Sequence, residues 1–269
     1  MESIGFIGSG NMAEALIKGI ISAGLYNPEN VLISDIRPER LDFLAKQYDV
    51  QKADSNAALV EKVDIVVLSI KPQNMTDALE SIKGAVGSKK LVISIAAGKK
   101  VANITSVLGD MAAVRVMPNT PALIGEGASA LYANDKAKPM LEKAKSIFSA
   151  VGKTVIVDDE GLIDAVTAVS GSGPAYYFLL MEEMIKSAVE LGLAEDAAKD
   201  LVLQTAKGAG MLATEADKNG ESPSQLRQKV TSPGGTTEAA LKELTAGNFG
   251  PLIKSAIKKA CDRSRELSA

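Results

Sequence analysis

The chain has 269 residues, enough for one large domain or two ordinary ones that each bury a core. The chain has a single cysteine, Cys261, which excludes an internal disulfide and a cysteine-based metal cluster. It has no histidine, which argues against zinc chemistry, and we expect no metal. Proton transfer is therefore assigned to water, hydroxyls, carboxylates or lysine. The net charge is -3 and the lysines are scattered, which predicts a protein that does not bind nucleic acid. The amino terminus has no basic region, and no apolar run reaches about 18 residues. We therefore expect a cytoplasmic protein that does not bind membrane.

Up to residue 158, short apolar runs rich in valine and isoleucine alternate with amphipathic segments. The runs predict buried strands at residues 3–7, 31–34, 63–70, 91–95, 112–117 and 154–157. The segments between them predict helices at residues 12–23, 38–48, 56–61, 74–83, 101–108 and 136–151. This alternation is typical of an α/β domain with a doubly wound parallel sheet of the Rossmann type, and we assign residues 1–158 to a dinucleotide-binding domain.

From about residue 160 the pattern changes to long segments rich in alanine, leucine, glycine and methionine. Apolar residues three and four apart predict helices at residues 162–191, 194–216, 222–229, 236–245 and 251–266. Small residues let helices approach closely, and these faces bury more surface than one chain supplies. We therefore expect an all-α C-terminal domain, residues 159–269, that interlocks with a second copy as a homodimer.

The six residues after the first predicted strand have the G-x-G-x-x-A pattern of a dinucleotide-binding turn. They are Gly8, Ser9, Gly10, Asn11, Met12 and Ala13. Gly8 permits a tight turn, Gly10 lets the backbone approach a pyrophosphate, and Ala13 allows a helix to pack closely on a strand. Because a strand precedes the pattern and a helix follows it, we expect cofactor phosphates at this helix N-terminus.

The residues after the second predicted strand bear on the choice of cofactor. Asp35 lies near the position where an acidic residue binds the ribose 2′-hydroxyl of NAD. Arg37 is placed to pair with the 2′-phosphate of NADP, or else is a solvated residue before the helix that starts at Pro38. The two residues leave both cofactors open, and we expect the chain to use either.

Further loops follow later strands, at the edge where open α/β sheets bind ligands. One loop begins with Ser69, Ile70, Lys71 and Pro72, another contains Ala97 and Gly98, and a third covers residues 118–121. Pro72 and Pro121 also stop strands, so structural punctuation explains them equally well.

A hydroxyl-rich turn precedes the predicted helix at residues 236–245. Residues 231–237 read Thr-Ser-Pro-Gly-Gly-Thr-Thr, so free backbone amides and short hydroxyls meet at a helix N-terminus. Such a turn suits a small anion. A proline and glycine turn capped by a threonine is the structural alternative.

Six segments together resemble the pyrroline-5-carboxylate reductase family across essentially the whole chain. They are IGFIGSGNMAEALIKG, VVLSIKPQ, ISIAAG, RVMPNTPALIGEG, LIDAVTAVSGSGPAYYF and QKVTSPGGTTEAALKEL. GSGNMA alone is shared with many dehydrogenases, whereas SGSGPAY and VTSPGGTT are more specific. The resemblance implies hydride transfer from NADH or NADPH to the C=N carbon of 1-pyrroline-5-carboxylate, which gives L-proline in the last step of proline biosynthesis. It also implies dimers that assemble into a decamer of five dimers.

The resemblance also assigns individual residues. It implies cofactor contacts by residues 8–13, by the loop with Asp35 and Arg37, and by Asn56, Ser69, Ile70, Lys71, Pro72, Ala97 and Gly98. It implies substrate binding by the helical domain through Glu160, Ser232, Gly234, Gly235, Thr236 and Thr237. Backbone amides would hold the carboxylate, and the catalytic Thr237 hydroxyl would reach the ring nitrogen. Glu160 before a helix is equally an ordinary dipole-compensating residue.

Several alternatives remain open. Another imine or hydroxyacid dehydrogenase of this layout would use a catalytic lysine on a helix of the second domain; Lys186 is the candidate, although an exposed helix lysine explains it better. A non-catalytic nucleotide-sensing protein would also suit the fold, but the fingerprint and the hydroxyl-rich turn are both intact. Asp35 and Arg37 depart from the hydroxyl-rich loop of many NADPH-preferring members, and the sequence does not decide whether the turn serves its own chain or a partner.

Overall fold

The computed structural model describes residues 2–268 and falls into two compact units. One unit runs up to Pro174 and includes the residues from Lys259 onward; the other is Ala175–Lys258. This division does not coincide with the boundary predicted after residue 158. The reason is that α7 (Leu162–Val166) packs on the sheet, and the last turn of α12 (Phe249–Leu267) contacts α7 and the loop after β5. The functional boundary at residue 158 stays a prediction, and its outer limits, residues 1 and 269, lie outside the described residues.

Eight strands form a single sheet in the order β3-β2-β1-β4-β5-β6-β7-β8. Their bounds are Ile4–Ile7, Val31–Ser34, Gln51–Lys52, Ile65–Leu68, Leu91–Ser94, Ala112–Met117, Gly127–Ala133 and Gly152–Ile156 for β1 to β8. Because β1 pairs in parallel with both β2 and β4, the strand order reverses at β1. The doubly wound parallel sheet is therefore confirmed, and ligands bind such sheets beyond the strand ends near this reversal.

Two strands differ from the sequence prediction. β3 has only the exposed residues Gln51 and Lys52, so no apolar run marks it. β7 reads GASALYA, without the valine and isoleucine that mark the other strands, and it pairs antiparallel to β6. Small side chains and one reversed strand explain why the periodicity did not reveal it.

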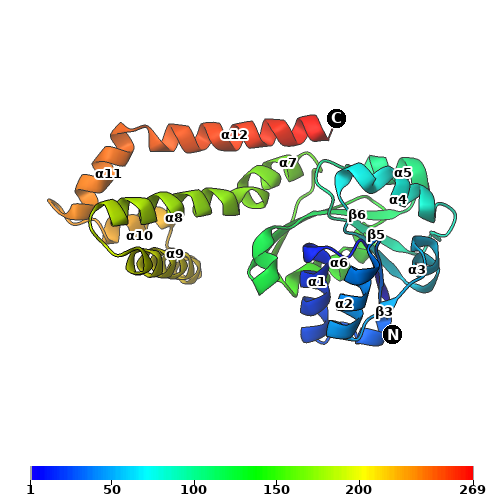
Figure 1. The fold of residues 1–269 in the computed structure, drawn as a ribbon. Coiled ribbons are helices and arrows are strands. Elements are labelled where there is room, and N and C mark those ends of the chain that lie inside the picture. The colour runs from blue at the N-terminus through cyan, green and yellow to red at the C-terminus, as the bar shows by residue number, and fades with distance from the viewer. Residues whose placement is uncertain (1, 269) are drawn as a thin grey trace. The chain divides into compact units, whose positions relative to one another are not determined.

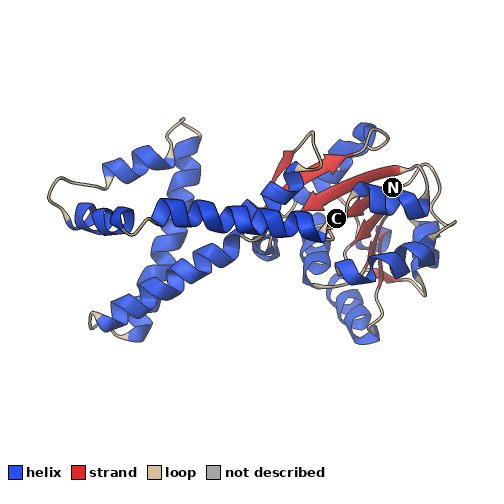
Figure 2. Ribbon diagram, turned by 90° about the horizontal axis from the view of Figure 1, so that it is seen from above, coloured by secondary structure: helices blue, strands red, loops and turns tan. Residues whose placement is uncertain are grey.

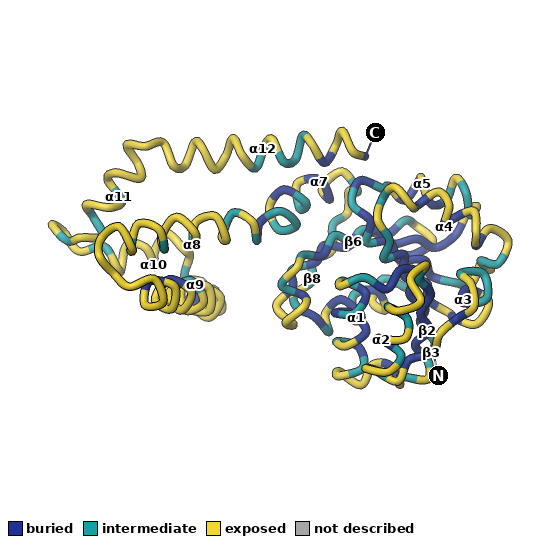
Figure 3. Tube along the Cα trace, in the orientation of Figure 1, coloured by how far each residue is buried: buried dark blue, intermediate teal, exposed yellow. Residues whose placement is uncertain are grey.

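Helices cover both faces of the sheet, and each face has its own apolar core (Figure 1). On one face lie α1 (Asn11–Ser22), α2 (Pro38–Tyr48) and α6 (Leu141–Ser149); on the other lie α3 (Asn56–Lys62), α4 (Met75–Ile82) and α5 (Val101–Leu108). Figure 3 shows the buried residues concentrated on the central strands of this unit. Burial of the strands from both sides anchors the loops at their carboxyl ends.

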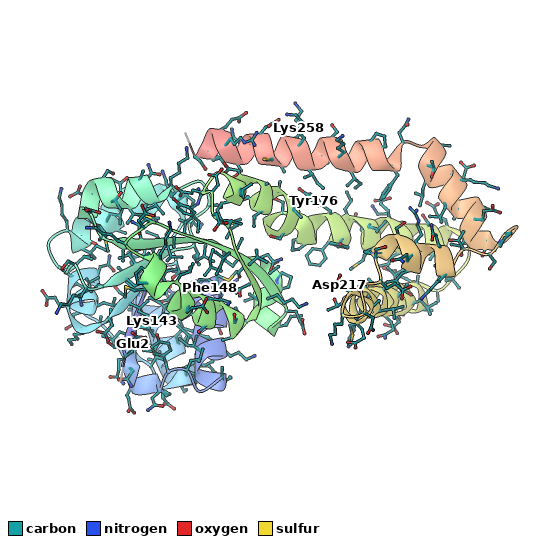
Figure 4. The ribbon with its side chains drawn as sticks, turned by 180° about the vertical axis from the view of Figure 1, so that it is seen from behind. Glu2, Lys143, Phe148, Tyr176, Asp217 and Lys258 are labelled. Atoms are coloured by element: carbon teal, nitrogen blue, oxygen red, sulfur yellow. The ribbon has the colours of Figure 1, made fainter. Side chains whose placement is uncertain are left out.

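The beginning of the chain is attached to α6. Glu2 pairs with Lys143, and it accepts a hydrogen bond of 3.3 Å from the hydroxyl of Tyr26. Phe148, further along the same helix, lies fully buried in the core (Figure 4). The start of β1, and with it the turn that follows, is thus held in place.

The second unit consists of helices and the loops that join them (Figure 2). It holds most of α8 (Gly173–Glu190), α9 (Glu195–Asp217), α10 (Pro223–Lys229), α11 (Thr236–Ala246) and the first part of α12. The expected helix at residues 162–191 is interrupted by a π-helical turn at Thr167–Gly171. The all-α second domain is confirmed.

Large apolar side chains remain exposed along these helices, among them Tyr177, Phe178, Met211 and Leu252, each more than half accessible. Exposed large apolar side chains in this number are typical of an interaction face. Among residues 2–268, no helix combines the length and the apolar character needed to cross a membrane.

Candidate active site

The turn between β1 and α1 has the geometry that the glycine pattern predicts. Gly8 has a φ of +91°, and a Cβ atom there would lie 2.6 Å from the Ser69 carbonyl oxygen, so a larger residue does not fit. The Gly8 amide donates to the Ser34 carbonyl at 2.7 Å. Ala13 is completely buried against the sheet. The turn is thus held tightly between the ends of β2 and β4.

The N-terminus of α1 is open where a phosphate group would bind. Gly10 is the N-cap residue; no side chain caps the helix, and a Cβ atom at Gly10 would meet nothing within 4 Å. Asn11 is exposed and Met12 half-buried, so the first turn faces outward. The hydroxyl of Ser9 is fully buried, and among residues 2–268 it is the one buried side-chain polar atom without a hydrogen-bond partner. Free amides, open space and an unused hydroxyl fit a dinucleotide pyrophosphate.

Asp35 and Arg37 bind each other rather than pointing apart. The Arg37 Nε atom lies 3.0 Å from Asp35 Oδ1, and its Nη2 atom lies 3.1 Å from Oδ2. The amides of Arg37 and Ser9 donate to the same carboxylate at 3.0 and 2.7 Å. Burial raises the pKa of Asp35, but the hydrogen bonds from Arg37 and Ser9 outweigh it and hold that pKa below its usual value. All four acceptor positions of the carboxylate are thus in use.

Arg40 is a further charged residue at the turn, which the sequence analysis did not single out. Its Nε atom donates to the Ser9 carbonyl at 2.6 Å, its Nη2 atom pairs with Glu14, and its guanidinium lies 5.2 Å from the centre of the Phe43 ring. The Tyr48 hydroxyl donates to Glu14 at 3.1 Å. These residues clamp α2 against the turn. Partners so far apart in the chain leave no local sequence signal.

Asn56, the first residue of α3, is bonded on both sides of its amide. It accepts from the Ser34 hydroxyl at 2.7 Å and donates to the Ser81 hydroxyl at 2.9 Å. Its side chain therefore lies directly beside the end of β2, next to the residue that precedes Asp35.

The loop after β4 lies against the glycine turn. The Ser69 amide donates to the Ile7 carbonyl at 2.9 Å, and its hydroxyl donates to the Gly8 carbonyl. Ile70 contacts the position where a Gly8 Cβ atom would lie. Lys71 is exposed, and Pro72 begins a short 3₁₀ turn. The expected cofactor residues of β1, β2 and β4 thus gather at one edge of the sheet.

The loop after β5 takes a left-handed turn at Gly98, whose φ is +68°. Ala97 is half-buried and Gly98 is buried. Glu160 approaches the start of the next helix: its Oε1 atom accepts from the Val101 amide at 2.7 Å and lies 3.4 Å from Nη1 of the buried Arg115. Glu160 therefore compensates the dipole of α5. The structure leaves its expected contact with substrate a prediction.

The hydroxyl-rich turn belongs to the second unit. Gly234 has a φ of +73°, and Gly235 is the N-cap residue of α11, which no side chain caps. The Gly234 amide donates to the Glu238 carboxylate at 2.8 Å, and the Gly235 amide donates to the Ser232 carbonyl at 3.0 Å. Ser232 and Thr236 are exposed, and Thr237 is half-buried. Within residues 2–268 the Thr237 hydroxyl makes no hydrogen bond. The turn thus already binds one carboxylate, that of Glu238 in the same chain.

Lys186, the lysine considered for a different mechanism, is bound by two carboxylates. Its Nζ atom lies 2.7 Å from Glu182 Oε1 and 2.8 Å from Glu183 Oε1 on the same exposed helix face. Hydrogen bonds from Lys186 to Glu182 and then to Glu183 raise the pKa of the ammonium group above its usual value. A paired lysine with a raised pKa is a poor proton-transfer group.

Family models match both parts of the chain. The model described as pyrroline-5-carboxylate reductase dimerisation matches residues 160–267, and the model described as NADP oxidoreductase coenzyme F420-dependent matches residues 3–98. The first match covers the hydroxyl-rich turn, and the second covers the glycine turn and the ends of β2, β4 and β5.

Relatives match along nearly the full length. The pyrroline-5-carboxylate reductase of Pseudomonas aeruginosa is 44% identical over 98% of this chain and 96% of its own. The solved structure of the Coxiella burnetii enzyme is 40% identical, covers 100% of this chain and 99% of its own, and gives a TM-score of 0.94. That of the Plasmodium falciparum enzyme with NADP bound is 32% identical, covers 100% and 98%, and gives a TM-score of 0.87. The chain belongs to the pyrroline-5-carboxylate reductase family.

Proposed function

We infer that this chain is an NAD(P)-dependent oxidoreductase that reduces the C=N bond of 1-pyrroline-5-carboxylate to L-proline, the last step of proline biosynthesis. The observation that carries this inference is the open N-terminus of α1 beside Gly8 and Gly10, in a chain that matches reductases over 98% of its length. A helix N-terminus without a side-chain cap, next to two glycines, accepts a pyrophosphate.

We propose that residues 8–13 hold the pyrophosphate of the cofactor. Asp35, Arg37 and Asn56 would bind the adenosine ribose or its phosphate, and Ser69, Ile70, Lys71, Pro72, Ala97 and Gly98 would line the remainder. Because Arg37 and Asp35 neutralise each other, the ribose end carries little net charge, which supports use of either NADH or NADPH.

We propose that the hydroxyl-rich turn holds the substrate. Amides near Gly234, Gly235 and Thr236 would bind the substrate carboxylate; the N-terminus of α11, which no side chain caps, supports this role. The Glu238 carboxylate, which accepts from the Gly234 amide, would move aside when the substrate binds. Ser232 would add a hydroxyl contact. Glu160 would approach the substrate from its position before α7, although its present partners are Val101 and Arg115.

The chemistry requires an anchor, an aligned imine and one proton. When bound, the reduced nicotinamide supplies the hydride, which adds to the imine carbon while the nitrogen holds a proton, so that the product is a secondary amine. The Thr237 hydroxyl, which has no partner within residues 2–268, would orient the protonated ring nitrogen. Fixed alignment of the reactants supplies most of the rate, which suits a chain without histidine.

The protein acts as a homo-oligomer. We propose that its unit is a dimer formed through the helices of Ala175–Lys258, and that five dimers form a decamer. The exposed apolar side chains of these helices support the dimer, since a partner's helices would remove them from water. Light scattering after gel filtration tests both sizes.

We further propose that the protein works in the cytoplasm and binds neither membrane nor nucleic acid. The single Cys261 requires no oxidising compartment, and the chain carries a net charge of -3. Fractionation of the producing cells, followed by immunoblotting of soluble and membrane fractions, tests this location.

The decisive experiment follows absorbance of the reduced cofactor in the presence of purified protein. We expect NADH and NADPH to be oxidised when 1-pyrroline-5-carboxylate is added, with L-proline as the product by mass spectrometry. A 2-hydroxy or 2-keto acid in its place serves as the control and should give no turnover. Failure of both cofactors to react with pyrroline-5-carboxylate, in protein that binds them, would refute the enzymatic function.

A further inference from the structure

A buried polar network joins the end of α12 to the sheet. Arg115 on β6 is 2% exposed; its Nη1 atom lies 3.4 Å from Glu160 Oε1, and its Nη2 atom lies 4.0 Å from Asp164 Oδ1. Asp164 in turn accepts hydrogen bonds from the Ser264 hydroxyl at 2.6 Å and the Ser268 hydroxyl at 3.5 Å. Both serines are buried, whereas the residues between them are exposed. The last turn of α12 is therefore bonded to a buried ion group formed by side chains of β6 and α7.

The same turn of α12 lies against the loop after β5. A Cβ atom at Gly98 would lie 2.8 Å from the Leu267 carbonyl oxygen and 3.0 Å from the Leu267 Cβ atom. Three residues later, the Val101 amide donates to Glu160, the other carboxylate that Arg115 contacts. Residues 98–101 are thus held at one end by α12 and at the other by the ion group.

We propose that residues 264–268, the C-terminal strap, position the Ala97–Gly98 loop for the cofactor, and that Arg115, Asp164 and Ser264 are positioning residues for hydride transfer. The proposal rests on the assignment of Ala97 and Gly98 to cofactor binding under the proposed function. It adds a function for residues far from the cofactor fingerprint in sequence.

The buried ion group is stable only when each of its charged members is paired. A buried guanidinium needs both carboxylates, and the Asp164 carboxylate needs the strap hydroxyls, because removal of one partner leaves a charge without compensation. When the Ser264 hydroxyl is lost, the strap loosens and Gly98 loses the backbone behind it. Hydride transfer depends strongly on alignment, so a shift of this loop should act on cofactor binding and turnover.

The first test compares three variants as intact proteins. Ser264→Ala removes the hydroxyl, Ser264→Thr keeps it, and Lys259→Gln changes an exposed residue of the same helix outside the strap as the matched control. We expect Ser264→Ala to raise the KM for NADH and NADPH by about 3- to 30-fold and to change the KM for pyrroline-5-carboxylate by less than about twofold. Ser264→Thr and Lys259→Gln should stay near the parent values.

A double-variant cycle then tests whether strap and loop act together. Gly98→Ala places a methyl group against Leu267 and at a positive φ, so it should weaken cofactor binding. With Ser264→Ala already present, the strap can move away, and Gly98→Ala should have a smaller fold-effect. Effects that simply multiply, or a Ser264→Ala variant that lowers the melting temperature while its cofactor KM is unchanged, would overturn the proposal.

Direct cofactor binding separates this proposal from the proposed function. Titration of NADH or NADPH, followed by the fluorescence of the reduced nicotinamide, needs no turnover. If the parent protein binds cofactor but does not reduce pyrroline-5-carboxylate, the proposed function fails, and the titration still measures the strap. If the parent turns over normally and the titration curves of Ser264→Ala and Gly98→Ala match it, the strap proposal fails alone.

Discussion

Replacement of Asp35 by serine should shift the cofactor preference toward NADPH. The Asp35 carboxylate lies at the end of β2 with its side chain 6% exposed, and it holds the Ser9 amide of the glycine turn at 2.7 Å as well as Arg37. A 2′-phosphate brought to this place meets a negative carboxylate. Once the carboxylate is removed, that repulsion disappears and Arg37 becomes available to pair with the phosphate.

The size of the shift follows from Coulomb's law. Two unit charges about 4 Å apart interact by about 1 kcal/mol in water and about 4 kcal/mol near a protein surface. Because Arg37 is 52% exposed and already offsets part of the carboxylate charge, we take the lower part of this range. We therefore expect the ratio of kcat/KM for NADPH to that for NADH to rise by about 5- to 30-fold, which corresponds to a free energy of about 1–2 kcal/mol.

The assay uses the ratio of the two kcat/KM values because loss of the hydrogen bond from the Ser9 amide weakens the binding of both cofactors alike. Asp35→Asn keeps an oxygen for the Ser9 amide and removes only the charge, so it should shift the ratio in the same direction. Asp42→Ser, at an exposed carboxylate of the neighbouring helix, is the control for net charge and should leave the ratio unchanged. If Asp35→Ser and Asp42→Ser give the same ratio as the parent protein, Asp35 does not lie at the ribose site.

Three shorter predictions concern other residues. Thr237→Ala should lower kcat by about 10- to 100-fold, the worth of one hydrogen bond to a charged nitrogen, and leave the Kd for cofactor unchanged; equal kcat values would exclude the hydroxyl from the reaction. Lys186→Met should keep kcat/KM within about twofold, because the lysine is paired and its pKa is raised, and a large loss would favour a lysine mechanism. Hydrogen bonds from the Ser3 amide and hydroxyl hold the pKa of Asp64 below its usual value. The ionised Asp64 carboxylate therefore adds stability to the fold, by less than about 1 kcal/mol. This contribution is complete above about pH 4 and is lost as the pH falls through the lowered pKa. The difference in Tm between the parent and Asp64→Asn should accordingly close in acid, and a difference that persists there would contradict this cause.

The elements with strong periodicity could be predicted from the sequence, and those with weak periodicity could not. The strand at Ile65–Leu68 reads IVVL and is buried throughout, so its composition alone identifies it. β7 has alanine and glycine where other strands have valine, and its direction depends on β6, which is a tertiary property. The glycine turn was predictable because its function requires a local pattern of residues.

The polar contacts around the candidate site are a different case. Arg40 and Ser9 are 31 residues apart in the chain, and Ser264 and Asp164 are 100 residues apart, so no spacing rule connects them. Asp35 and Arg37 are neighbours, yet the sequence left open whether they bind each other or a ligand. Only the fold brings these side chains within hydrogen-bond distance.

The first compact unit is completed by a segment that follows the other unit in the chain, since the residues from Lys259 onward belong to it. During synthesis the ribosome releases this segment only after residues 175–258 have emerged. The sheet can form early, but the Asp164 carboxylate and the surface beside Gly98 stay uncovered until residues 264–268 emerge. A deletion within residues 264–268 would therefore affect the nucleotide-binding unit rather than the helices that precede this segment in the chain.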